Sequence, residues 1–226
     1  MNDTLANSLI ETIEDETSNI VSDVGELTLN ILIDNDSVIS DIPFVSTAVS
    51  IYKIGHSIWE LQHLKQLCIF VNAVRNETVD DKKRRKYIKA FEKKDEKTRN
   101  KELEYIVLIC GKYIDDKKSK YLAKLFLGYI EGKMGWEAFV SYSEIIDRFL
   151  LGDYETLVEG EQNNICDNDV SDSVLRLVSL GLFYSVTDEV SMPNYPGNIV
   201  YPGNIQKNYR LTKFGRIMRD CLFNNI

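Results

Sequence analysis

Apolar residues recur at helical spacing through most of the first 150 residues, and this pattern constrains the fold more than any other feature. Leu122, Leu125, Phe126 and Tyr129, for example, return every three or four positions with polar residues between them. Such spacing places the apolar side chains on one face of an α-helix. No strand is needed before residue 150, and the short connections between the helices predict antiparallel neighbours in a bundle.

The segment 40–74 carries the widest apolar stripe. Ser40 or Asp41 can cap a helix whose first turn holds Pro43, where a missing N–H costs nothing. The uncharged run that follows covers eleven residues, whereas crossing ~30 Å of hydrocarbon takes ~20. A central buried helix, or one that lies on a membrane surface or against a partner, is therefore expected. The candidate contact residues for such a surface are Phe44, Val45, Val49, Tyr52 and Trp59.

Charge is strongly segregated along the chain, although the net charge is only −8. Residues 1–52 contain ten acidic side chains and no basic one, while residues 75–133 contain eighteen basic and eleven acidic ones. The acidic head could lie against the basic middle of its own or a neighbouring chain, at distances within the ~8 to 10 Å screening length. The alternative is that these are solvated helix faces of opposite sign.

The basic run KKRRK, residues 82–86, is typical of sites for nucleic acid or anionic lipid. The alternative is again a solvated helix face, since Glu92, Asp95 and Glu96 follow closely in the sequence.

The pattern changes after residue 172. Ser173–Leu180 predicts a short helix that ends at Gly181 in a left-handed cap. Residues 182–186 and 208–212 favour strands, and residues 213–223 are again helical.

The motif "LxxLVSLGLFY…YRLTKFGR" in this region resembles the end of many bacterial winged-helix proteins. Trp136–Leu150 and Tyr154–Val158 would supply the first two helices of such a domain. The fold class expected is mainly α, with an acidic N-terminal segment at 1–36, a helical bundle at 37–133 and a winged-helix-like domain at 134–226. A two-stranded β-wing belongs to the last of these.

DNA binding through this module is disfavoured by its charge. Residues 134–226 carry seven basic and thirteen acidic side chains, whereas cations that neutralise phosphates supply most of the affinity of such domains. The expected recognition helix offers only one cation. The candidate nucleic-acid contacts are Arg176, Lys207, Arg210 and Lys213.

The wing contains the sequence YPGNI twice, at Tyr195–Ile199 and at Tyr201–Ile205. Each YPGN favours a type II turn, with Pro second and Gly third. Between residues 187 and 206 the only charges are Asp188 and Glu189. The wing is therefore expected to contact protein, in a partner or a second copy, through Met192, Tyr195, Ile199, Val200, Tyr201 and Ile205.

Motifs for catalysis or cofactors are not evident. His56, Glu60 and His63 share a helix face at i, i+4 and i+7, but they do not form HExxH, and a polar-tipped helix stripe is the preferred interpretation. GYIEGKMG, residues 128–135, lacks the Walker A spacing and predicts a turn between helices. The four cysteines form no CxxC pair, which favours reduced thiols in the cytoplasm. We expect no cofactor, no metal and no enzymatic activity.

The run Pro43–Leu157 resembles uncharacterised bacterial helical proteins that share the pattern "YIEGKxxxExFxxxSEIIDR", here Tyr129–Lys133 and Glu137–Arg148. Proteins of this kind are often encoded on mobile or phage-defence loci. The resemblance implies a cytoplasmic interaction or effector protein of abortive-infection type that docks a protein partner or the inner membrane surface. A winged-helix DNA-binding transcriptional regulator is the alternative.

Overall fold

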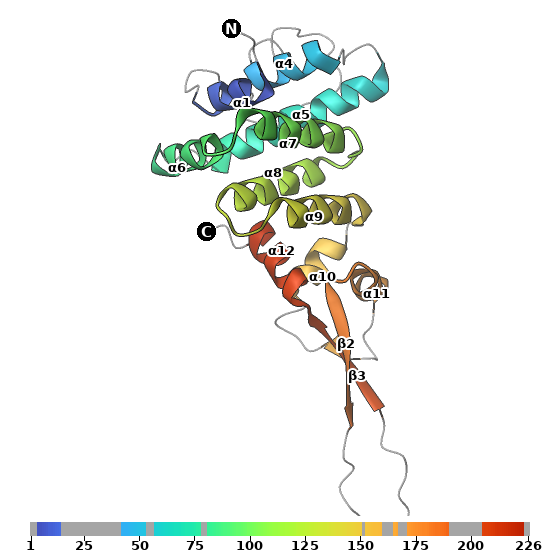
Figure 1. Cartoon of the computed structure of the whole chain (residues 1–226). Helices are drawn as coiled ribbons and strands as arrows, with labels where there is room; N and C mark the ends of the chain where they lie inside the picture. The colour runs from blue at the N-terminus through green and yellow to red at the C-terminus, as the bar shows by residue number, and fades with distance from the viewer. Residues whose placement is uncertain are drawn as a thin grey trace, which may run out of the picture. The chain divides into compact units, whose positions relative to one another are not determined.

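The structure, a computed structural model, describes residues 4–14, 42–52, 57–77, 81–150, 152–159, 165–166, 171–189 and 205–223. Contacts between residues divide the chain into two compact units, Met1–Asp147 and Arg148–Ile226. Within the described ranges the first unit is helical, and the second combines short helices with a small antiparallel sheet (Figure 1). The prediction of a mainly helical chain is confirmed.

The first unit is built from helices joined mostly by short turns (Figure 1). They are α1 (Leu5–Glu14), α4 (Pro43–Tyr52), α5 (Ile58–Glu77), α6 (Asp81–Glu92), α7 (Glu96–Cys110), α8 (Asp116–Ile130) and α9 (Trp136–Arg148), the last of which ends at the boundary between the units. The predicted first-turn position of Pro43 is confirmed.

Helix α5 lies at the centre of this unit and packs against α8, α7, α4 and α1. Leu67, Phe70 and Val71 are fully buried, and the ring of Phe70 lies 5.7 Å from that of Phe126 on α8. Burying side chains of this size stabilises the fold by ~1.5 to 3 kcal/mol each. The expected buried central helix is therefore present, with α4 as a separate helix before it.

Side chains from other helices cap the exposed amides at two helix starts. The backbone N–H of Ala6 donates to Asn100 Oδ1 at 2.9 Å, and the N–H of Phe44 donates to Thr12 Oγ1 at 2.9 Å. The first turn of a helix has no internal acceptors for such donors. These bonds fix α1 on α7 and α4 on α1, while the predicted caps at residues 40 and 41 lie outside the described residues.

A buried polar network joins α5 to the start of α8. Gln66 is fully buried, accepts from Ser119 Oγ at 2.6 Å, and donates to Asp116 Oδ1 at 3.0 Å and to the carbonyl oxygen of Ile114 at 3.3 Å. Lys65 completes the network with an ion pair to Asp116 at 2.8 Å. Because each polar atom is matched, the network fixes the register of the two helices without an unsatisfied group.

Helix α9 packs against α7 and the turn that follows it. The Trp136 ring lies 5.6 Å from that of Tyr105, and Tyr105 Oη is 2.7 Å from Ser143 Oγ. Tyr113 Oη donates to the carbonyl oxygen of Ser143 at 2.9 Å. The division between the units accordingly follows residue 147, whereas the sequence led us to expect a boundary at 133/134 with this helix in the C-terminal domain.

The second unit comprises α10 (Asp153–Glu159), β1 (Ile165–Cys166), α11 (Asp172–Ser179), β2 (Phe183–Glu189), β3 (Ile205–Leu211) and α12 (Lys213–Phe223). Its antiparallel sheet has the order β1-β3-β2, with Phe183 paired to Leu211 at one end of the hairpin. The two predicted strands are confirmed. The two-residue strand β1 was not predicted, because it is too short to show an alternating pattern.

Two glycines are required at the junctions of this unit. Gly181 follows α11 with a φ of +74°, which confirms the predicted left-handed cap. A Cβ at Gly215 would collide with the carbonyl oxygen of Leu182, so α12 can approach the start of β2 only through a residue without a side chain.

Candidate functional site: a basic groove along α6

Helix α6 has two faces of opposite chemistry. Tyr87, Ile88 and Phe91 are buried against the rest of the unit, and the Phe91 ring meets that of Phe126 edge to face at 6.1 Å. These contacts anchor the helix. The face turned away from them is almost entirely basic and lines a groove of about 890 Å³.

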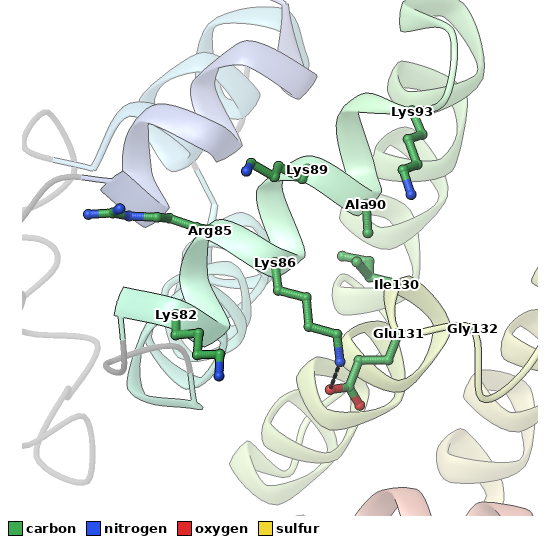
Figure 2. A pocket seen from close by; sticks show the side chains of 9 residues that line it. All are labelled: Lys82, Arg85, Lys86, Lys89, Ala90, Lys93, Ile130, Glu131 and Gly132. Carbon is green, nitrogen blue, oxygen red and sulfur yellow. Dashed lines mark ion pairs between the residues drawn. The ribbon is translucent and has the colours of Figure 1, made fainter.

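The groove lies between α6 and the turn that follows α8 (Figure 2). Only two of its lining side chains are apolar, and most of the others are cations. The lining residues are Lys82, Arg85, Lys86, Lys89, Ala90, Lys93, Ile130, Glu131 and Gly132.

The five cations of the groove recur at i, i+3, i+4, i+7 and i+11 from Lys82 to Lys93. That spacing places them in one stripe along the helix, about 16 Å long at 1.5 Å per residue. Like charges one turn apart destabilise a helix by ~0.2 to 0.5 kcal/mol per pair. The stripe is therefore a local cost to stability, which distinguishes it from a solvated face of mixed charge.

Glu131 is the single carboxylate among the lining residues. Its carboxylate lies 3.6 Å from Lys86 Nζ and 2.8 Å from Lys133 Nζ, and it accepts from Tyr87 Oη at 3.2 Å. Burial raises the pKa of Glu131, but the hydrogen bonds from Lys133 and Tyr87 and the nearby lysine charges outweigh it, so the net pKa is lowered. The carboxylate stays ionised and holds Lys86 at one edge of the groove (Figure 2).

Three cations of the stripe are not neutralised by the described residues. Arg85, Lys89 and Lys93 form no ion pair within the described part of the chain, and all three side chains are exposed. Figure 2 shows Arg85 and Lys89 extending away from Glu131. The described lining residues thus carry more positive than negative charge.

The acidic residues that follow the basic run in sequence point elsewhere in space. Glu92 lines a separate hollow with Glu11 and Glu14 of α1. Asp95 caps α7 by accepting from the N–H of Thr98 at 2.9 Å and from its hydroxyl at 2.6 Å. Glu92 and Asp95 therefore do not neutralise the cations of the groove, although they follow them closely in sequence.

A buried ion pair fixes the end of α6. Lys94, in the turn after the helix, donates to both carboxylate oxygens of Glu102 at 2.9 and 3.1 Å, and its ammonium lies 3.7 Å from the centroid of the Tyr129 ring. Tyr129 Oη also donates to Glu102. Burial raises the pKa of Glu102, and the hydrogen bond and charge of Lys94 lower it only in part. This cluster ties the groove wall to α7 and α8.

The helix predicted to form a membrane or partner surface is mostly core. Phe44 and Val45 are fully buried and Val49 and Tyr52 are half-buried, so these side chains stabilise the bundle, whereas Trp59 is 76% exposed. Periodicity alone does not separate these roles, because a core stripe and a docking stripe have the same spacing. Ile58, Leu108 and Ile114 are also large exposed apolar side chains of the first unit.

Glu60 and His63, two members of the predicted histidine cluster, make structural hydrogen bonds at α5. Glu60 Oε2 accepts from the N–H of Ser57 at 2.8 Å, and Ser57 Oγ accepts from the N–H of Glu60 at 3.3 Å, which forms a capping box at the start of α5. His63 Nε2 lies 2.6 Å from the carbonyl oxygen of Val107, and burial lowers its pKa. His56 lies outside the described residues, and those described contain no group of three metal-ligating side chains.

Arg176, the one cation of the expected recognition helix, is held by a buried carboxylate. Its Nε lies 3.1 and 3.0 Å from the two oxygens of Asp153, and its guanidinium reaches Asp153 Oδ1 at 2.7 Å. Asp153 is fully buried and also accepts from the N–H of Leu150 at 2.7 Å. Burial raises the pKa of Asp153, but these hydrogen bonds lower it to a greater extent. The pair joins α11 to α10, and the guanidinium of Arg176 is engaged by Asp153.

The remaining candidate contacts are dispersed. Arg210 and Lys213 are exposed at the end of β3 and the start of α12, and Lys207 lies on β3 without a described side chain. Ile205 begins β3. The other predicted wing contacts, Met192, Tyr195, Ile199, Val200 and Tyr201, lie outside the described residues.

Comparison of the chain with protein-family models, with curated proteins and with solved structures found no match. No helix within the described ranges has the length and apolar character that crossing a membrane requires.

Proposed function

We propose that the chain is a non-enzymatic interaction protein that docks an anionic partner through the groove along α6. The observation that carries this proposal is that Arg85, Lys89 and Lys93 line a groove of about 890 Å³ without an ion pair within the described residues. A row of like charges costs helix stability. Its presence over an anchored, concave surface is explained by an anion that neutralises it on binding.

The second unit acts in this proposal as a winged-helix-like module for protein contact. The order α10, β1, α11, β2, β3, α12 contains the helix, two-stranded hairpin and final helix on which this proposal rests. Because Arg176 is paired with Asp153, the expected recognition helix, α11, has little charge left to bind phosphate. The exposed side chains of Leu175 and Tyr184 suit protein better than DNA. A DNA-binding regulator therefore remains the weaker function.

The sequence resemblance to proteins of phage-defence and abortive-infection type supports a bacterial effector role for this docking. In this role the protein works in the cytoplasm or at the inner surface of the membrane. Trp59 and Ile58, exposed by 76% and 74% at the start of the 20-residue α5, add a second surface of apolar character.

The groove is tested with a pair of variants that change net charge equally. The groove variant is Arg85→Glu/Lys89→Glu, and the control variant is Lys101→Glu/Lys120→Glu, whose lysines are exposed on α7 and α8 and do not line the groove. Binding to fluorescent poly-glutamate is measured by anisotropy over a range of salt concentrations.

We expect the native chain and the control variant to bind poly-glutamate at low salt, and the groove variant to bind at least about tenfold more weakly. Added salt should weaken the binding, since ions screen exposed charges. Absence of binding by the native chain at low salt, or equal loss in both variants, refutes docking through this groove.

The alternative function has its own readout. If the chain is a DNA-binding regulator, duplex DNA binds with an affinity that Arg210→Glu/Lys213→Glu removes and the groove variant leaves unchanged. The membrane surface is tested by flotation with vesicles that do or do not contain anionic lipid. A protein that binds poly-glutamate but never floats has a protein partner.

A further inference from the structure

We infer that the outer edge of β2 is a self-association surface, to which β2 of a second copy of this chain adds as an antiparallel strand. The inference goes beyond the groove along α6, which plays no part in it. It rests on the proposed role of the second unit in protein contact, and it names the partner as a second copy. The order of the sheet, the direction of the β2 amides and the sequence of the strand support it.

Strand β2 is the end strand of the described sheet. The order is β1-β3-β2, and β2 pairs with β3 along all seven of its residues. One edge of β2 is therefore paired, while its other edge has no strand beside it within the described part of the chain. The side chains of Tyr184, Ser185 and Thr187 are exposed. An edge strand of this kind presents a row of backbone donors and acceptors to which another strand can add.

One hydrogen bond fixes which amides of β2 are used by β3. The N–H of Thr212 donates to the carbonyl oxygen of Leu182 at 2.9 Å, and these two residues follow directly on the paired residues Leu211 and Phe183. Leu182 and Thr212 are therefore a hydrogen-bonded pair. Hydrogen-bonded and non-hydrogen-bonded pairs alternate along an antiparallel ladder.

The alternation assigns the remaining amides of the strand. Tyr184 and Val186 direct their N–H and C=O groups toward β3, and Phe183, Ser185 and Thr187 direct theirs toward the outer edge. Outside the β2–β3 ladder, no hydrogen bond within the described residues engages these three outward amides. The outer edge is thus ready to pair with a further strand.

The sequence of β2 lacks the features that usually protect an edge strand. Phe183–Thr187 reads FYSVT and contains no charged residue and no proline. Its pairing with β3 runs without a bulge. Natural sheets discourage edge pairing with lysine, proline or bulges. An uncharged, regular and exposed edge is explained by a strand that covers it.

The backbone of β2 is complementary to a second copy of itself. A two-fold axis at Ser185 places this residue opposite its own counterpart, and places Phe183 opposite Thr187 of the second copy. All of these positions have outward amides, so each outward N–H and C=O of the stretch meets a partner. The contact is isologous, as in most homodimers, and it joins the two sheets into one.

The side chains and charges agree with the same register. Tyr184, which is 44% exposed, comes opposite Val186 of the second copy, and an aromatic residue across from a β-branched one is a favourable cross-strand pair. The acidic positions 188 and 189 come opposite positions 182 and 181, which are uncharged. Like charges therefore do not meet, and the strand's match to itself favours a second copy over a strand of another protein.

Sedimentation equilibrium of the native chain from about 1 μM to about 200 μM tests the inference, and we expect a dimer that dissociates on dilution. Ser185→Pro removes the N–H at the two-fold axis, but the β2–β3 ladder does not use this N–H. This variant should dimerise at least about tenfold more weakly, because proline at an edge blocks strand addition. The control Ser185→Ala keeps the N–H and should dimerise as the native chain does. Thermal unfolding by circular dichroism confirms that the variants are folded.

A pair of charged variants tests the two-fold axis without proline. Ser185→Lys and Ser185→Glu each bring like charges together across the axis, and each variant alone should dimerise more weakly than the native chain. An equal mixture of the two should form a mixed dimer, because opposite charges then meet. A mixture that stays monomeric while the native chain dimerises overturns the inference.

Amide exchange measured by NMR locates the contact within the strand. The amides of Phe183, Ser185 and Thr187 should exchange more slowly at high than at low protein concentration. The amides of Tyr184 and Val186, which bond to β3, should be protected at both concentrations and serve as internal controls.

The outcomes separate this inference from the function on which it rests. A native chain that is monomeric at about 200 μM overturns the second copy as the partner and leaves the edge to a strand of another protein. A dimer that Ser185→Pro and both charged variants retain at full affinity places the contact elsewhere and also overturns the inference. Absence of poly-glutamate binding by a chain that dimerises through β2 refutes the groove alone.

Discussion

Replacing Lys94 with methionine should destabilise the first unit, and the loss should depend on pH. Lys94 is the cation for Glu102, whose side chain is only 7% exposed. Removing one partner of a buried ion pair costs ~3 to 5 kcal/mol. Because the Lys94 side chain is itself 28% exposed, water already offsets part of the pair, and we expect a loss of about 2 to 3 kcal/mol at pH 8.

The pH dependence follows from the pKa of Glu102. Burial already raises that pKa in the folded protein, and loss of Lys94 removes the two effects that lower it. A carboxyl with a raised folded-state pKa favours folding at low pH, where it is protonated, and this contribution is lost as pH rises through the folded-state pKa. The difference between variant and native chain should therefore shrink from pH 8 to pH 5.

Urea unfolding followed by circular dichroism at both pH values measures this difference. Adding Glu102→Gln to the Lys94→Met variant should restore most of the stability at pH 8, because a neutral amide needs no counter-ion. Lys101→Met, at an exposed site on α7, should change the free energy of unfolding by less than about 0.5 kcal/mol. An equal loss at pH 5 and pH 8, or no rescue by Glu102→Gln, would refute the reasoning.

Three further predictions concern contacts away from the groove. Ser119→Ala leaves the buried Gln66 carbonyl oxygen without its donor and should cost about 1 to 3 kcal/mol, measured by urea unfolding. Gly215→Ala places a Cβ against the carbonyl oxygen of Leu182 and should lower the melting temperature of the second unit. Since the pKa of Asp153 is lowered, its contribution to stability should be lost as pH falls through its folded-state pKa, and Asp153→Asn should flatten this acid limb in calorimetric scans.

The elements with strong local patterns were predicted well. The apolar spacing on α8, the first-turn proline of α4 and the cap at Gly181 each depend on a few neighbouring residues, and the structure has all three. The two strands of the hairpin were predicted from their β-favouring residues, with ends that differ from the structure by a few positions.

The assignment of α9 was not predictable in the same way. Its amphipathic pattern shows that it packs against something, but not against which unit. Trp136 and Ser143 decide this by meeting Tyr105, more than thirty positions earlier in the chain. Similarly, the stripe around Phe44 was consistent with core or surface until burial distinguished them.

The sequence by itself determined that the chain is mainly helical and that α6 carries a dense basic run, because periodicity and charge are local properties of the sequence. Only the tertiary structure decided that this run forms a groove. Glu131 meets Lys86 and Tyr87 from more than forty residues away, and the acids that follow the run, Glu92 and Asp95, turn to α1 and α7. A binding surface depends on which helix faces are buried by other elements, and contacts between residues far apart in sequence decide that.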